Sequence, residues 1–312
     1  MKLLRSKHEF FPMKLLNFVF FFYVSCCFSQ KDDFRSYYRS SNLADYYLYK
    51  KDTLKAKAIY DSLVEKYPNY DHNFGLVYYA IGERKKAIRS WQITCEKGVN
   101  LEYFKEYIHF DRLNHRDQKK IIRAAEKFNA NKNKVLIQLL DSLINSDQNI
   151  RIESYSNPNL SLSELTEIVK KTDLQNLQLL YDMFKKNGFP SLKEIGFYGY
   201  KVVDMLIHHG MRYFDEKDSV FLFFHNNLIE LIKEGIYHPN SFAQSYDQYK
   251  EWICKSDQFY ASYPDENNLI HTNLTIDEIN KNRFSIGLGK IEHYLEMNHF
   301  KLAKNNLTEI EK

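Results

Sequence analysis

The residues best placed to do chemistry are a charged pair on one predicted helix. Asp147 and Arg151 lie four residues apart, so they are neighbours on a helix face, and they continue the leucine stripe of residues 136–143. Buried charge is costly unless it is paired. The pair therefore predicts either a polar pocket that includes Gln148, or a structural ion pair that fixes how two domains dock.

A histidine on a second predicted helix is the next candidate. His209 falls on the inward face of the predicted helix 197–214, in line with Leu206. Imidazole titrates near neutral pH, so a buried histidine can act as a general base or donate to a ligand. The alternative is a hydrogen-bonded core histidine. His208 points to the other side, where we expect it to pair with Asp204 one turn earlier.

The helices that must position these side chains are predicted from apolar spacing and end signals. After a helix from Asn131, a loop is expected to begin at residue 152, and Thr172 or Asp173 is expected to cap the next helix. Gly188 and Pro190 end that helix. Further helices are predicted over residues 197–214 and 217–234, from Pro239, over 276–297 after a Thr275 cap, and over 299–311. No segment shows the alternation of a strand, so the fold class is all-α.

Residues 34–98 resemble tetratricopeptide-type repeats, which are stacked helical hairpins. Small residues let paired helices approach closely, aromatic residues fill the groove between them, and proline ends the second helix. The two units are offset by 31 residues, from Ala44 to Gly75, rather than the usual 34. The matching positions are Ala44, Tyr47, Ala56, Tyr60, Leu63 and Pro68 in one unit, and Gly75, Tyr78, Ala87 and Trp91 in the next. Two helices over residues 101–130 are expected to cap these hairpins.

The part from residue 131 onward resembles a family of bacterial, often exported, helical domains of unknown function. The resemblance implies that Asp247 and Tyr260 share a pocket with His209, although Asp247 alone would equally suit a solvated helix position. The chain departs from the family where it has Tyr260-Ala261-Ser262-Tyr263 in place of Tyr-Gly-Thr-Gln, and Gln248 in place of arginine. The shared pieces are Asp147-Gln148-x-x-Arg151, Gly188-Phe189-Pro190-Ser191, Glu194-Ile195-Gly196, His208-His209, Ala243-x-x-x-Asp247, Gln258-x-Tyr260 and Arg283-x-x-x-Gly287-Leu288.

The N-terminal segment, residues 1–29, has the layout of a secretory signal: basic residues, an apolar run, then small residues. Translation could begin at Met13, and a lipid anchor at Cys26 or Cys27 is the minor alternative to cleavage after Ser29. The apolar run is short for a membrane span, so no membrane insertion is expected after cleavage. We therefore expect an exported protein of the periplasm or the cell surface.

The charge balance bears on the possible partners, and the cysteine content bears on disulfide bonding. Residues 1–29 hold four of the 44 Lys and Arg and one of the 40 Asp and Glu, so the mature chain would be almost neutral. Such a balance gives no reason to expect a nucleic-acid partner. Only Cys95 and Cys254 would remain after cleavage, either as a disulfide or as two separately buried thiols.

Motif searches indicate neither a metal site nor a cofactor. The sequence contains no His-Glu-x-x-His, no Cys-x-x-Cys and no glycine-rich phosphate loop, and its histidines lack metal-ligand spacing. We therefore expect an exported interaction or scaffold protein that binds a protein or peptide partner. The alternative is a hydrolase in which Asp147, His209 and Asp247 do acid–base work and Arg151 holds an anionic group. The predicted organisation is a signal segment (1–29), hairpins (30–130), a helical domain (131–297) and a final helix (298–312).

Overall fold

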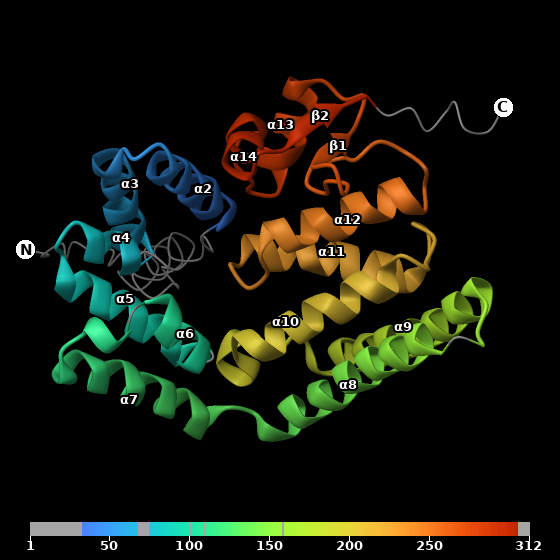
Figure 1. The fold of residues 1–312 in the computed structure, drawn as a ribbon, viewed down its shortest axis with the longest axis horizontal. Coiled ribbons are helices and arrows are strands. Elements are labelled where there is room, and N and C mark those ends of the chain that lie inside the picture. Colours follow the sequence, from blue (N-terminus) through green and yellow to red (C-terminus); the bar gives the residue numbers. More distant parts are fainter. Residues whose placement is uncertain (1–32, 68–74, 100, 109, 158, 305–312) are drawn as a thin grey trace, which may run out of the picture. The chain divides into compact units, whose positions relative to one another are not determined.

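Helices make up most of the part of the chain that can be described. The computed structural model describes residues 33–304, apart from residues 68–74, 100, 109 and 158. It has 13 α-helices and two short strands in that part, which confirms the all-α fold class (Figure 1). The signal segment expected over residues 1–29 and Pro68 lie outside the described residues.

The N-terminal helices pack in successive pairs. Helix α2 packs on α3, α4 packs on α5, and α5 also packs on α7 (Figure 1). Ala44 and Ala56 are fully buried, as close helix pairs require. The bounds are α2 Arg35–Tyr49, α3 Thr53–Lys66, α4 Gly75–Ala80, α5 Arg84–Glu96, α6 Leu101–Tyr107, a 3₁₀ turn Phe110–Arg112, and α7 His115–Asn131. The hairpins are therefore present, while their membership of the tetratricopeptide family stays a prediction.

One glycine shows how closely α4 and α5 approach each other. A Cβ atom built on Gly75 would lie 2.0 Å from Nε1 of Trp91, so no larger residue fits at this position. The Trp91 side chain itself is completely buried. The two helices of the second hairpin therefore pack closely where the small residue Gly75 meets the large residue Trp91.

Three long helices follow and pack on one another. They are α8 Lys134–Ser156, α9 Leu162–Asn187 and α10 Leu192–Met211. The prediction of a helix capped by Thr172 or Asp173 was wrong, because the helix is capped by Ser161, which forms a reciprocal capping box with Glu164. The expected loop is correspondingly short, since α8 continues to Ser156.

Helix α10 has a kink that brings it against the N-terminal half of the chain. Gly196 has φ 69°, and the N–H of the next residue, Phe197, donates to the Gly98 carbonyl over 3.2 Å. A Cβ on Gly196 would lie 3.0 Å from that same carbonyl oxygen. Glycine is therefore needed here for both its left-handed conformation and its small size.

The C-terminal part adds four helices and a small sheet: α11 Ser219–Lys233, α12 Pro239–Trp252, α13 Ile276–Ser285, α14 Ile291–Asn298, and strands β1 Leu269–His271 and β2 Lys301–Ala303. The strands pair in parallel, with Ile270 opposite Leu302. The single helix expected over residues 276–297 is interrupted at Gly287, whose φ is 93°. The final helix expected over 299–311 was wrong for Lys301–Ala303, which form β2, and residues 305–312 lie outside the described part.

Residues on either side of position 130 contribute to one large hydrophobic core. The Phe34 N–H donates to the Lys233 carbonyl over 2.9 Å, and the Tyr38 hydroxyl donates to the Tyr237 carbonyl over 3.1 Å. The predicted boundary between two domains at residue 130 stays a prediction. No helix in the described part is long and apolar enough to cross a membrane.

The two cysteines in the described part are not joined to each other. Cys95 is fully buried and Cys254 is half-buried, and both are thiols. Of the two alternatives open from the sequence, the structure has the separate thiols. A disulfide therefore contributes nothing to holding α5 and the segment after α12 in place.

Candidate polar site on helices α8, α9 and α10

The structure brings together four of the side chains singled out from the sequence. The Nδ1 atom of His209 lies 3.0 Å from the Asp147 carboxylate. Arg151 donates to both oxygens of the same carboxylate over 3.2 Å, through Nε and Nη2. Gln148 donates to it over 2.7 Å. Asp147 thus takes part in four hydrogen bonds, three within α8 and one, with His209, to α10, and none of these residues precedes residue 130.

A second carboxylate, which the sequence analysis missed, completes this cluster. Asp173 lies inside α9 and accepts a hydrogen bond from Arg151 over 2.5 Å and another from Arg212 over 2.9 Å. Arg151 therefore bridges Asp147 and Asp173. We call these five residues (Asp147, Arg151, Asp173, His209 and Arg212) the polar site.

The acidic and basic members of the polar site differ in their exposure. Both carboxylate side chains are 0% exposed, whereas the side chains of Arg151, His209 and Arg212 are 15%, 19% and 19% exposed. The acids lie at the helix seam and the bases extend from it toward solvent. A ligand at this surface would meet N–H donors from the guanidinium groups of Arg151 and Arg212, together with the imidazole ring of His209.

The charges in the site stabilise one another. Burial alone would raise the pKa of Asp147, but His209 and Arg151 outweigh this effect and hold that pKa far below its usual value. Burial raises the pKa of Asp173, and the guanidinium groups of Arg212 and Arg151 oppose the rise. Because Asp147 stays ionised, its oxygens only accept, so Nδ1 of His209 carries a proton. The other ring nitrogen, Nε2, is not engaged by Asp147.

The same residues include a set with the spacing of a metal site. One ligand atom from each of Asp147, Asp173 and His209 lies within 4.8 Å of the others. The Arg151 guanidinium already bonds to both carboxylates and supplies the positive charge there. The geometry thus fits an internal ion network better than a divalent cation.

His208 contacts α12 instead of the predicted partner. Its Nδ1 atom lies 2.9 Å from the Ser245 hydroxyl. Asp204, which we expected to pair with it, accepts from the Tyr237 hydroxyl. Burial, together with His209 and Arg212 nearby, lowers the pKa of His208 to about 4. This imidazole is therefore neutral at physiological pH.

Asp247 and Tyr260 belong to a different cluster. Asp247 is fully buried and accepts from the N–H groups of Phe259, Tyr260 and Ser262 over 2.7–2.8 Å, and from the Ser262 hydroxyl over 2.6 Å. Burial raises its pKa to about 6, against the effect of these bonds. Its contacts fasten the loop after α12 and do not involve Asp147 or His209. Asp247 is thus neither a solvated helix residue nor a direct partner of the polar site.

Ala261, in that loop, occupies the position where the resembled pattern has glycine. Its φ is 50°, which lies in the left-handed region. Its methyl group is fully buried beside Ile270, Ile279 and Ile291. The turn therefore has the conformation that favours glycine, but it is built here with alanine.

Comparisons with known proteins place no further constraint on the site. No protein-family model matches the chain, and no curated protein or solved structure is significantly similar to it. The two resemblances inferred from motifs accordingly stay predictions. Function has to be argued from the geometry of the polar site.

Proposed function

We propose that this chain is a helical binding protein whose polar site holds an anionic group of a protein or peptide partner. One observation carries the proposal: the two carboxylates are completely buried, and the three basic side chains that they hold are partly exposed. A ligand oxygen at this surface would accept hydrogen bonds from groups whose orientation is already fixed. Such preorganisation lowers the cost of binding.

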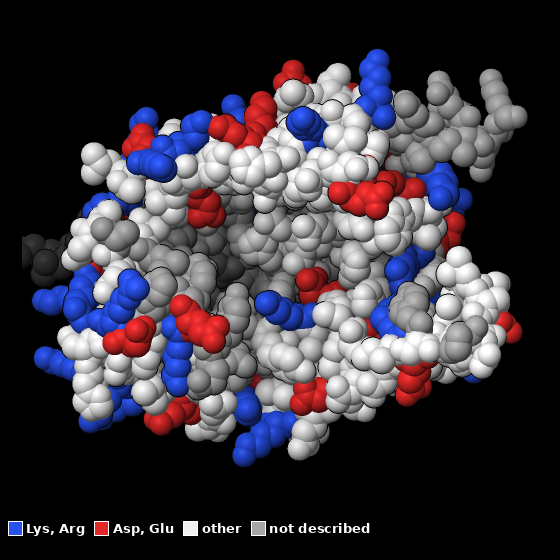
Figure 2. All heavy atoms as spheres, viewed as in Figure 1, with Lys and Arg blue, Asp and Glu red and all other residues white. Residues whose placement is uncertain are grey.

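The surface charge would attract anions at the polar site and not over the whole face of the molecule. Basic and acidic side chains are interspersed over the face seen in Figure 2. Recognition would therefore depend on the polar site and on neighbouring contacts. The paired helices α2–α7 are a common framework for binding extended partners. An exported location, in the periplasm or at the cell surface, is part of this proposal and depends on residues 1–29.

The test uses inorganic phosphate and a glutamate-rich peptide as probes, with NMR detection of the His209 ring. Both probes should shift the His209 signals saturably. Arg212→Gln should weaken binding about ten- to hundredfold, because one charge-assisted hydrogen bond contributes about 1.5–3 kcal/mol. Arg84→Gln is the matched control, since Arg84 also pairs with a buried aspartate, Asp117, at 2.8 Å but lies on α5. Unshifted His209 signals, or an equal effect of both variants, would contradict the proposal.

One observation favours a second candidate, a hydrolase. Asp147 holds Nδ1 of His209 at 3.0 Å, so Nε2 is positioned as a base, with two arginines beside it to hold an anionic substrate. Hydrolysis of nitrophenyl esters and nitrophenyl phosphate should then fall at least 100-fold in His209→Gln and Asp147→Asn, since such groups contribute about 10²–10⁴. Hydrolysis that both variants retain would exclude this function.

A further inference from the structure

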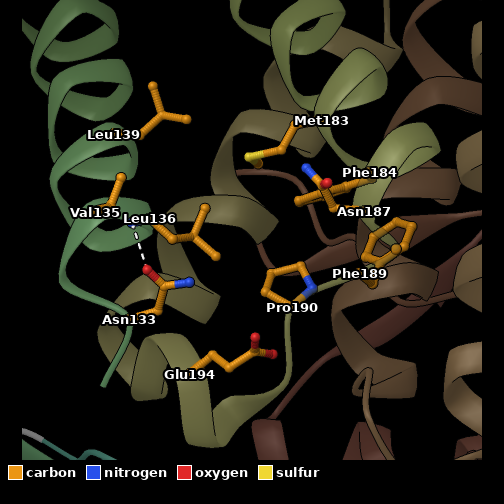
Figure 3. A pocket seen from close by; sticks show the side chains of 11 residues that line it. Asn133, Val135, Leu136, Leu139, Met183, Phe184, Asn187, Phe189, Pro190 and Glu194 are labelled. Carbon is orange, nitrogen blue, oxygen red and sulfur yellow. Dashed lines mark hydrogen bonds between the residues drawn. The ribbon is translucent and has the colours of Figure 1, made fainter. Parts of the chain in front are cut away.

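A second site lies at the other end of the same helices. An open cavity of about 430 Å³ lies between the start of α8, the end of α9 and the loop that leads into α10 (Figure 3). Its size is within the range of pockets that bind small molecules. None of its lining residues belongs to the polar site, so it carries an independent inference.

The walls of this cavity are mainly apolar, with Asn133 and Asn187 as their polar members, and one end carries a single carboxylate. Figure 3 shows Leu139 and Met183 toward one end, Glu194 at the other, and Leu136 and Pro190 between them. Phe189 closes the side formed by the loop. A ligand that fills this space would bury an apolar body and place one polar end at Glu194.

The Glu194 carboxylate is held in place and still has an oxygen to offer. It forms the capping box of α10, in which its Oε2 atom accepts from the Ser191 N–H at 2.8 Å and from the Ser191 hydroxyl at 2.9 Å. Both bonds use Oε2, so the capping box leaves Oε1 unused. A positively charged or N–H donor group in the cavity would be its complement.

The cavity rim is fixed by the backbone as well as by these side chains. The Asn133 N–H donates to the Glu194 carbonyl over 2.9 Å, which ties the start of α8 to the start of α10. Asn133 also caps α8 by accepting from the Leu136 N–H over 3.1 Å. The space between the two helix starts is therefore set by the fold and does not depend on a ligand.

We propose that this cavity binds a small amphipathic cation, with its alkyl part against Leu136, Leu139 and Met183 and its ammonium group at Glu194. The charge selects for cations, and the apolar walls supply most of the contact area. The site is separate from the polar site, so either proposal can fail without the other.

The probes are hexylammonium, hexanol and hexanoate, which share an alkyl chain and differ in charge. The mature chain, labelled at its methionine methyl groups, is titrated by NMR, and the Met183 signal is identified with Met183→Leu. Hexylammonium should shift this signal saturably and bind more tightly than hexanoate. Glu194→Gln keeps the capping box, since glutamine also serves there, and should weaken hexylammonium binding about three- to fivefold while leaving hexanol binding unchanged.

The chain offers a matched control for this substitution. Glu164 forms the same capping box with Ser161 at the start of α9 and does not line the cavity. Glu164→Gln should therefore leave hexylammonium binding unchanged. Leu139→Trp, at a partly exposed wall position, should fill the cavity and abolish the shifts while the helix content stays constant. The proposal is overturned if hexanoate binds as tightly as hexylammonium, if Glu194→Gln has no effect on hexylammonium, or if Leu139→Trp retains binding.

Discussion

Asp173 is the residue whose removal should most clearly show what the polar site contributes to stability. Its side chain is 0% exposed and accepts from Arg151 at 2.5 Å and from Arg212 at 2.9 Å. Removing one partner of a buried ion pair costs about 3–5 kcal/mol. In Asp173→Asn, Arg151 keeps both bonds to Asp147, and Arg212 remains partly solvated. We therefore expect the free energy of unfolding to fall by an amount near the lower end of this range, about 3 kcal/mol. Because asparagine has almost the same volume as aspartate, the substitution leaves no cavity that would add to this loss.

The assay is unfolding in urea at pH 7, followed by far-UV circular dichroism. Asp182→Asn is the control, because Asp182 lies on the same helix, is exposed, and accepts a hydrogen bond from Gln178 at 3.0 Å. The control should change the free energy of unfolding by less than about 0.5 kcal/mol. If Asp173→Asn lowers the free energy of unfolding no more than the control does, the ion pairs of Asp173 with Arg151 and Arg212 do not stabilise the fold, and our account of the network is wrong.

Three further predictions concern single positions. His208→Gln should remove part of the pH dependence of stability. Because the pKa of His208 is lowered from 6.5 to about 4, the wild-type protein is fully stable above pH 6.5 and should lose about 2 kcal/mol of its free energy of unfolding by pH 5, a loss that the variant should not show in urea unfolding. Ala261→Gly should change the free energy of unfolding by less than about 1 kcal/mol, because relief of left-handed strain offsets the greater entropy of unfolded glycine. Gly75→Ala should destabilise the protein by about 1–3 kcal/mol, since the added methyl collides with Trp91; unchanged thermal unfolding would contradict this.

The helices and the first part of the polar site could be predicted because both depend on one periodicity. Asp147 follows Leu140 and Leu143 at helical spacing, so its burial followed from the burial of the leucines. Helix α10 places His209 in line with Leu206 for the same reason. When two such stripes pack against each other, the polar residues on them meet.

Asp173 was missed although it carries the same signal. It lies one turn before Leu177 and in line with Leu180 and Phe184, all of which are buried. Aspartate is also a favourable helix cap, and the sequence was interpreted in that sense. The stronger start signal was the reciprocal pair of Ser161 and Glu164, which extends α9 through Asp173. A cap interpretation should therefore be weighed against any capping box upstream.

The small sheet could not be predicted from the sequence for a different reason. Strands β1 and β2 have three residues each and are separated by α13 and α14, so no hairpin turn marks their pairing. The hydrogen bond from Thr272 N–H to Ala303 over 3.0 Å depends on how those helices return the chain. Such pairing is decided by tertiary packing and leaves no pattern in the local sequence.

The positions of acids and bases in the polar site follow from the lengths of their side chains. Aspartate is short, so Asp147 and Asp173 can occupy stripe positions at the seam without displacing the leucines beside them. Arginine is long, so Arg151 can bond to both carboxylates and still extend toward solvent. Exchanging the two types would bury flexible cations and expose the carboxylates. The arginine N–H groups therefore face solvent because the aspartates, and not the arginines, occupy the buried positions between the helices. The proposed anion binding depends on this arrangement.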